Sequence, residues 1–364
     1  MRILLVSDLH LDTAFGWAGP ALGEVLRANL RATLDRIAAL ARQSRAEALL
    51  CGGDLFDQAR ATPKTLDHLR TSFAELEIPV HLTPGDDDWY GPSSPYRQVD
   101  WSPNVHVFTE ARLTPVTVED GLTLWGAAHD SPASTGGFLD GFRVDRAGVN
   151  LALFHGCETG TTAAAVPYAP FRAEQVEAAG LDHALLGHVH TPVDHAQFTY
   201  PGNPCPLTPG ETGPRGAVLV TVGDDGTVER TRYDVAGGRV HEVSVDVTGA
   251  SRSAEMRERV EEAVAGLAGV VRVTVHGALA PSVDLADLTG LGQDDAAHLD
   301  GLVLRQGQLD LGHDLDALAG ERTVRGQFVR DVRADSSLDE ETRTRVLLAG
   351  LRALDGRTPE PAVG

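Results

Sequence analysis

The feature that most constrains this chain is a local pattern that occurs five times: an apolar run that ends in Asp or His. The first run leads into Ser7-Asp8-Leu9-His10, and the others end at Gly53-Asp54, Gly85-Asp86, His155 and Gly187-His188-Val189-His190. Wholly apolar runs are typical of strands buried on both faces of a parallel sheet. Ligands bind at the carboxyl ends of such strands. Because side chains two apart in a strand share a face, we expect Asp8 and His10 to emerge together.

The segments between these runs predict an α/β fold. Helical periodicity covers residues 22–43, 64–76 and 172–179, and further strands are expected at 46–50, 79–83, 149–154 and 183–186. Alternation between residues 105 and 128 indicates short strands of a second sheet, and residues 217–222 and 227–234 form a predicted hairpin. We therefore predict a two-sheet α/β sandwich.

The length of 364 residues favours one large domain followed by a smaller one. We place the boundary near residue 240, after the Val235-Ala236-Gly237-Gly238 segment. Residues 241–355 are expected to form a small α/β domain, with strands at 240–247, 270–276 and near 302–304 and helices at 253–268 and 338–354. The last residues, 356–364, are predicted to be a disordered tail.

Two observations bear on the compartment. No window approaches the run of about 18 apolar residues that a membrane span needs, and the N-terminus enters a strand directly. The three cysteines, Cys51, Cys157 and Cys205, lack the close pairs of a zinc site or a disulfide framework. We therefore expect a cytoplasmic protein with no membrane contact and with reduced, buried thiols.

The strand-end side chains together suggest a metal site. Each alone has a plainer explanation: Gly53-Asp54 suits a simple turn, the carboxylates of residues 86–88 a solvated acidic loop, and His155 a hydrogen-bonded structural histidine. Seven such groups suffice for two ions that share one carboxylate, and such a pair is suited to phosphoester hydrolysis. Oxygen and nitrogen ligands without thiolate favour Mn²⁺ or Fe²⁺, with Zn²⁺ possible. The candidate ligands are Asp8, His10, Asp54, Asp86, His155, His188 and His190.

The net charge of −21 opposes unaided binding to DNA, which depends largely on neutralising phosphates. Residues 1–240 carry 30 acidic and 18 basic side chains, and residues 241–364 carry 22 and 13, so neither part is basic. A partner subunit could carry the DNA contact. Adaptation of the surface to salt is another explanation for the acidity.

The order of these motifs resembles the calcineurin-like metallophosphoesterases. Gly53-Asp54-Leu55-Phe56-Asp57, residues 184–190 and Tyr200-Pro201-Gly202-Asn203-Pro204 resemble, more narrowly, DNA-repair exonucleases of the SbcD/Mre type. The resemblance implies that Asp8, His10, Asp54 and His190 hold one metal ion and that Asp54, Asp86, His155 and His188 hold the other. It also implies manganese, a homodimer, an ATPase partner of the SbcC/Rad type, and a capping or accessory role for the C-terminal domain.

One motif departs from this family. The third family motif reads Gly-Asn-His followed by an acid, whereas this chain has Asp86 and Asp87 at the second and third positions. The family histidine lies near the scissile phosphate, which makes Asp87 the candidate catalytic position. A carboxylate there repels a phosphate unless it is protonated or bound to metal. We therefore expect exonuclease activity that is weakened, altered in substrate preference, or supported by a replacement group such as His129.

Three hypotheses follow. The leading one is a manganese-dependent phosphodiesterase that acts on DNA as a repair nuclease. The second is a phosphoesterase for a small or nucleotide substrate, which the acidic surface tolerates better. The third is a non-catalytic, metal-binding subunit that docks an ATPase and holds DNA ends, which Asp87 would permit.

Overall fold

The apolar runs form two sheets in the computed structural model, which describes residues 1–133, 135–160, 168–279, 296–311 and 315–354. The chain divides into two units, Met1–Arg239 and Val240–Gly364. The tail predicted at 356–364 lies outside the described residues.

The first sheet contains the strands that precede Asp8, Asp54 and Asp86. Its order is β12-β11-β1-β2-β3-β4, with β1 to β4 parallel and β11 antiparallel to both β1 and β12. The bounds are β1 (Arg2–Val6), β2 (Ala48–Cys51), β3 (Val80–Leu82), β4 (Val105–Val107), β11 (Ala217–Val222) and β12 (Val228–Tyr233). The β11–β12 hairpin is as predicted. Our assignment of residues 105–107 to the second sheet was wrong, because β4 pairs in parallel with β3 and alternation alone does not identify the neighbouring strand.

The second sheet contains β7, which ends at the predicted ligand His155, and β8, which precedes His188 and His190. Its order is β5-β6-β7-β8-β10-β9, and the strands from β6 through β7 and β8 to β10 are parallel. The bounds are β5 (Thr114–Glu119), β6 (Leu122–Gly126), β7 (Val149–His155), β8 (His183–Gly187), β9 (Val193–Asp194) and β10 (Phe198–Tyr200).

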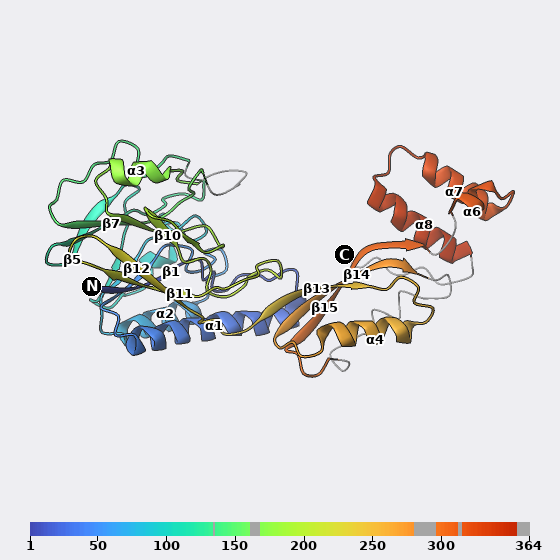
Figure 1. Cartoon of the computed structure of the whole chain (residues 1–364), viewed down its shortest axis with the longest axis horizontal. Coiled ribbons are helices and arrows are strands. Elements are labelled where there is room, and N and C mark those ends of the chain that lie inside the picture. Colours follow the sequence, from blue (N-terminus) through green and yellow to red (C-terminus); the bar gives the residue numbers. More distant parts are fainter. Residues whose placement is uncertain (134, 161–167, 280–295, 312–314, 355–364) are drawn as a thin grey trace. The chain divides into compact units, whose positions relative to one another are not determined.

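Side chains from both sheets form one buried core between them, which makes this unit the predicted α/β sandwich. Leu5 and Leu50 come from the first sheet, and Leu124, Leu153 and Leu185 from the second. The helices are α1 (Gly19–Gln43), α2 (Pro63–Ala74) and α3 (Ala173–Ala178), with a short 3₁₀ helix, η1 (Pro95–Arg97). Figure 1 shows α1 and α2 lying beside the first sheet, while α3 contacts β8 of the second.

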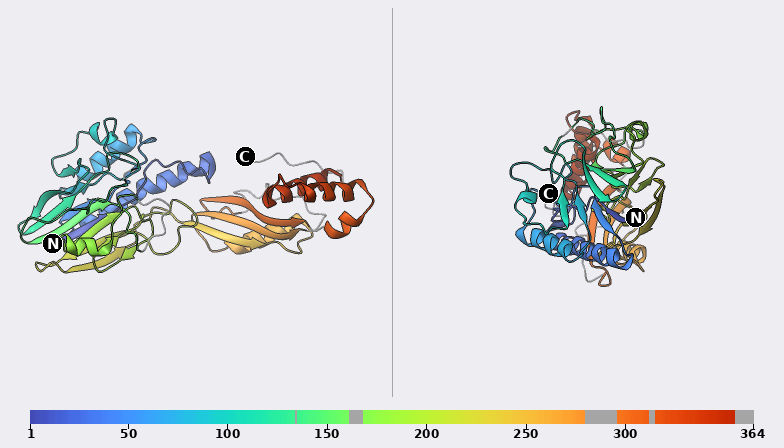
Figure 2. Two further views of the ribbon diagram at one scale, coloured as in Figure 1. Left: turned by 90° about the horizontal axis from the view of Figure 1, so that it is seen from above. Right: turned by 90° about the vertical axis from the view of Figure 1, so that its left-hand side faces the viewer.

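The second unit contains a parallel three-stranded sheet of order β13-β14-β15. The bounds are β13 (Val240–Asp246), β14 (Val270–Leu279) and β15 (Gly301–Leu311). Helix α4 (Ser253–Val264) buries Met256 and Val260 in the same core as Val271 and Val273 of β14. The helices α6 (Leu315–Gly320), α7 (Val324–Ala334) and α8 (Glu340–Leu354) form a separate small core, and Figure 2 shows α7 and α8 side by side. Of these three helices, only α8 was predicted.

Two further sequence observations can be compared with the structure. Cys51, Cys157 and Cys205 are buried, as expected, and none of them forms a disulfide bond within the described structure. Within the described parts of the chain, no helix combines the length and the apolar character that crossing a membrane requires.

Candidate metal centre

The loops that follow β1 and β2 hold the first predicted ligands in an unusual backbone conformation. Strand β1 ends at Val6, so strand alternation is not what brings Asp8 and His10 together, contrary to our expectation. Both residues have positive φ, 55° and 45°, as do Asp54 (51°) and His188 (99°). Residues other than glycine rarely adopt such angles, and they concentrate at functional sites where the surrounding structure imposes them.

Backbone hydrogen bonds between the two loops impose this conformation. The N–H of Asp8 donates to Gly53 O over 3.0 Å, and the N–H of His10 donates to Asp54 O over 3.0 Å. The second sheet joins the same network, because the N–H of His188 donates to Asp8 Oδ1 over 3.1 Å. The ligands that follow β1, β2 and β8 therefore have positions fixed by main-chain contacts.

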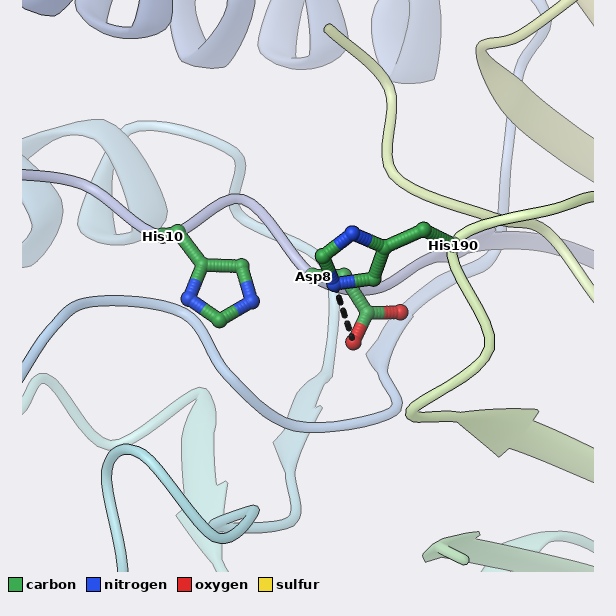
Figure 3. Close-up of side chains that lie close together, drawn as sticks. All are labelled: Asp8, His10 and His190. Atoms are coloured by element: carbon green, nitrogen blue, oxygen red, sulfur yellow. Dashed lines mark ion pairs between the residues drawn. The ribbon is translucent and has the colours of Figure 1, made fainter. Parts of the chain in front are cut away.

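One group of potential ligands contains Asp8, His10 and His190, which Figure 3 shows facing one another. His190 Nε2 lies 4.0 Å from Asp8 Oδ1, the ion pair drawn there as a dashed line. The His10 and His190 rings meet edge to face, with 5.2 Å between their centroids. Asp54 Oδ2 lies 3.5 Å from His10 Nε2, which places Asp54 beside this group.

A second group contains Asp86, His155 and His188, and Asp54 belongs to two further groups, one with Asp8 and His155 and one with His10 and Asp87. Asp86 Oδ1 lies 2.9 Å from His155 Nε2 and 3.3 Å from His188 Nδ1. Asp54 Oδ2 lies 3.2 Å from His155 Nε2, so the same carboxylate oxygen faces both groups. All seven predicted ligands thus lie in one cluster, and Asp54 occupies the shared position.

Three of the four histidines have an acceptor on the ring nitrogen that faces away from the cluster. His10 Nδ1 lies 2.9 Å from Asp57 Oδ1, His155 Nδ1 lies 2.9 Å from Gly52 O, and His190 Nδ1 lies 2.9 Å from Glu211 Oε1. Such partners orient metal-binding histidines and leave Nε2 free to coordinate. The role of Asp57 could have been inferred from its place three residues after Asp54, whereas no spacing signal identifies Glu211.

Charges inside the cluster are strongly coupled. Burial opposes protonation of His10, but its hydrogen bond to Asp57 and the charges of Asp54 and Asp8 raise its pKa to about 10. Burial likewise opposes protonation of His155, and the charge of Asp54 raises its pKa well above the usual value. For Asp54, burial favours the neutral acid, but the charge of His155 lowers the pKa to about 2. The histidines therefore compensate the charge of the buried carboxylates.

Whether the residues fit a metal pair can be judged from the atoms they leave unpaired. His10 Nε2 and His155 Nε2 are buried and make no hydrogen bond within the described structure, although both face carboxylate oxygens. Buried polar atoms without a partner are rare unless they serve a site. Imidazole nitrogens and carboxylate oxygens suit divalent transition metals, so the cluster fits them.

Asp88 has a structural role. The sequence alone could not distinguish this role from those of its neighbours Asp86 and Asp87. Its side chain is fully buried and accepts hydrogen bonds from the N–H groups of Gly85 (2.6 Å) and Leu55 (2.7 Å) and from Tyr96 Oη (2.6 Å). Burial and then the charge of Asp54 raise its pKa to about 7. Asp88 therefore connects the loop that carries Asp86 to the loop that carries Asp54.

Asp87 and His129 occupy different environments. The Asp87 side chain is 59% exposed, and its Oδ2 lies 3.4 Å from His10 Nδ1 at the margin of the cluster. His129 is fully buried, and its Nε2 donates to His155 O over 2.7 Å. The expectation that His129 could replace the missing family histidine was therefore wrong, because the side chain cannot reach a substrate.

The two sheets approach each other closely where the cluster forms. A Cβ at Gly187 would lie less than 3.0 Å from Ser7 Oγ and from Gly52 O. Gly187 precedes His188, and Gly52 precedes the segment that carries Asp54. The glycines of both motifs are therefore required for the backbones to come this close.

The sandwich and its strand-end cluster of acids and histidines define a metallophosphoesterase. The chain belongs to the calcineurin-like phosphoesterase family, which it matches over residues 1–192, and proteins of this family bind divalent metals. All seven predicted ligands lie in that range.

Two curated proteins are similar over most of the chain. One is the uncharacterized metallophosphoesterase YhaO of Bacillus subtilis, 26% identical over 280 residues, which are 72% of this chain and 67% of that protein. The other is the DNA double-strand break repair protein Mre11 of Methanopyrus kandleri, 28% identical over 297 residues. That alignment covers 71% of this chain and 62% of the Methanopyrus protein, so the chain spans about two thirds of the length of these relatives.

Two solved structures are also similar to this chain, at lower sequence identity. TT1561 of Thermus thermophilus matches with a TM-score of 0.38 and 13% identity, covering 64% of this chain and 98% of that one. The phosphoesterase YfcE of E. coli matches with a TM-score of 0.28 and 16% identity, covering 64% and 99%.

Proposed function

We propose that this protein is a two-metal, Mn²⁺-dependent phosphodiesterase that hydrolyses DNA as a repair nuclease. The observation that carries the proposal is the pair of ligand groups that share Asp54. One ion would be held by Asp8, His10, Asp54 and His190, and the other by Asp54, Asp86, His155 and His188. When bound, such a pair supplies Lewis-acid activation and stabilises charge on phosphoryl oxygens.

The protein contributes the orientation of these ligands. Asp57, Gly52 O and Glu211 hold three of the histidines so that each Nε2 faces the cluster. Asp88 fixes the loops that carry Asp54 and Asp86. A preformed arrangement of this kind needs little reorganisation when substrate binds.

Manganese is proposed from the donor atoms. Four imidazoles and three carboxylates without a thiolate suit Mn²⁺ better than a soft metal. Cys51 is buried nearby, but burial raises its thiol pKa above the usual value and so disfavours the thiolate that would bind metal.

DNA is proposed as substrate because of the SbcD/Mre-type motifs and the similarity to the Methanopyrus Mre11 protein. The charge of −21 makes unaided DNA binding weak, so we further propose a homodimer that acts with a coiled-coil ATPase of the SbcC/Rad type. The ATPase would provide the missing positive surface.

The position of Asp87 favours a second candidate function. Its exposed carboxylate stands beside His10, where it would repel an approaching phosphate. Partial desolvation and the charge of Asp54 raise the pKa of Asp87. A phosphoesterase for a small substrate, or a metal-binding subunit without catalysis, is therefore the alternative.

Hydrolysis assays with the native protein and Asp87→His test these proposals. The substrates are a DNA oligonucleotide and bis(p-nitrophenyl) phosphate, both with Mn²⁺, and bound metal is measured in parallel. The nuclease proposal predicts two metals per chain and DNA cleavage by the native protein. Cleavage of the small diester alone supports the small-substrate alternative. Activity that appears only in Asp87→His, with a gain of about 10²–10⁴, supports the non-catalytic subunit.

A further inference from the structure

His190 is the proposed histidine ligand that packing holds least. Its side chain is 32% exposed, compared with 7% for His10, 17% for His188 and none for His155. It follows β8 by three residues and contacts the cluster through the His10 ring and Asp8. Rotation of such an exposed ring has to be limited by a specific contact.

Glu211 provides that contact, from a loop 21 residues further along the chain. Its Oε1 lies 2.9 Å from His190 Nδ1. Its Oε2 accepts hydrogen bonds from Asn203 Nδ2 over 2.6 Å and from the N–H of Leu207 over 2.7 Å. Since Asn203 and Leu207 donate to one oxygen, the other oxygen is directed at the imidazole.

The loop around Glu211 is itself tied to the backbone of His190. Arg215 is 8% exposed, and its Nη1 donates to His190 O over 3.0 Å and also to Asn203 Oδ1. Arg215 Nε donates to Glu211 O over 3.1 Å. One guanidinium group thus joins the main chain of His190 to the residue that contacts its ring.

We propose that Glu211 is a positioning residue for the metal site: it accepts the Nδ1–H of His190 and so holds Nε2, with its lone pair, toward Asp8 and His10. The inference rests on the two-metal site proposed above. Carboxylates that accept the remote N–H of a metal-bound histidine fix its tautomer, and their loss typically lowers metal affinity about 10–100-fold.

Replacing Glu211 by glutamine distinguishes a role in orienting His190 from a role in packing alone. A glutamine side chain has the same shape but only one acceptor oxygen. If that oxygen keeps the two hydrogen bonds from Asn203 and Leu207, the amide NH₂ faces His190 Nδ1. The imidazole can then accept this bond only by moving its proton to Nε2, where it blocks coordination.

The experiment measures Mn²⁺ binding to the full chain by the electron paramagnetic resonance of free Mn²⁺, alongside melting temperature. The variants are Glu211→Gln and the conservative Glu211→Asp. Glu229→Gln makes the same change at an exposed site on β12, and Trp17→Phe keeps an aromatic side chain but removes the indole hydrogen bond to Leu207 O in the Glu211 loop. Both controls are expected to bind as the native protein does.

We expect two ions on the native chain, and in Glu211→Gln a loss of about 10–100-fold at one site with the other unchanged. Glu211→Asp should recover part of this loss, because it restores a carboxylate. Native affinity at both sites in Glu211→Gln, with or without a lower melting temperature, would overturn the inference while leaving the metal centre intact. Failure of the native protein to bind Mn²⁺ would instead contradict the proposed function itself.

Discussion

The shared position of Asp54 makes it the residue whose loss should affect the whole metal centre. One of its oxygens lies 3.5 Å from His10 Nε2 and 3.2 Å from His155 Nε2. Replacing this oxygen by an amide nitrogen removes a ligand from both proposed sites at once. The other six candidates each belong to one site.

We therefore predict that Asp54→Asn reduces bound Mn²⁺ to at most one ion per chain. Phosphodiester hydrolysis should fall by about three orders of magnitude, because several kcal/mol of charge stabilisation are lost. Metal analysis after gel filtration and assays with bis(p-nitrophenyl) phosphate measure both effects. Asp120→Asn, in an exposed turn, is the control. Two tightly bound ions in Asp54→Asn would show that the carboxylate is not shared.

Metal binding is also predicted to release protons. Neighbouring carboxylates raise the pKa of His10 to about 10 and that of His155 well above its usual value, so we expect both imidazoles to be protonated at pH 7 before metal binds. A bound metal ion requires neutral imidazoles, and the protons must leave. The apparent affinity for Mn²⁺ should therefore rise with pH between 6 and 8.

Calorimetric titration in buffers of different ionisation enthalpy measures this release. A binding enthalpy that depends on the buffer, with net protons released at pH 7, is the expected result. An enthalpy independent of the buffer would contradict the protonation of these histidines.

Many individual residues of the site could be predicted from the sequence, because the candidate ligands follow apolar runs that are visible in it. The seven candidates lie together as expected, although their roles as ligands remain predictions. Asp88 was not separated from Asp86 and Asp87, because three successive aspartates look alike until burial distinguishes them. Glu211 was missed because its contact with His190 depends on the path of a loop that has no periodic pattern.

At the scale of elements, most strands were predicted close to their observed bounds because buried parallel strands are continuous apolar runs. The sheet that contains residues 105–107 was assigned wrongly, since three alternating residues do not specify a neighbour. Helices α6 and α7 were not predicted at all. Helix α6 has only six residues, and the core that α6 and α7 share with α8 contains only five buried apolar side chains among the described residues.

The contact between the two sheets at Gly187 yields a prediction for the fold. A methyl group there would approach Ser7 Oγ and Gly52 O more closely than real contacts allow, so the sheets must separate locally. Overpacking of this kind costs about 1–3 kcal/mol. Gly187→Ala should lower the free energy of unfolding by that amount and weaken Mn²⁺ binding.

Urea denaturation and metal titration test Gly187→Ala. Gly136→Ala is the matched control, because an added Cβ at that position meets no atom within 4 Å. Equal stability and equal metal affinity in the two variants would mean that the sheets do not need this close approach.

At the scale of the whole molecule, all proposed ligands and Glu211 lie in the unit Met1–Arg239. We predict that a chain of residues 1–239 folds and binds two Mn²⁺ ions with an affinity within about threefold of the full chain. Circular dichroism establishes whether the shorter chain is folded, and Mn²⁺ titration gives the affinity. A folded fragment that binds fewer ions would show that the second unit contributes to the site.

The metal centre joins two sheets whose strands are far apart in sequence, and this has a consequence for synthesis of the protein. Asp8 leaves the ribosome early, but the last proposed ligand is His190, and the residue that orients it is Glu211. A nascent chain therefore has no complete centre until almost the whole first unit has been translated. If the proposed centre is what hydrolyses the substrate, we expect a chain that ends before His190 to be inactive without a separate inhibitor.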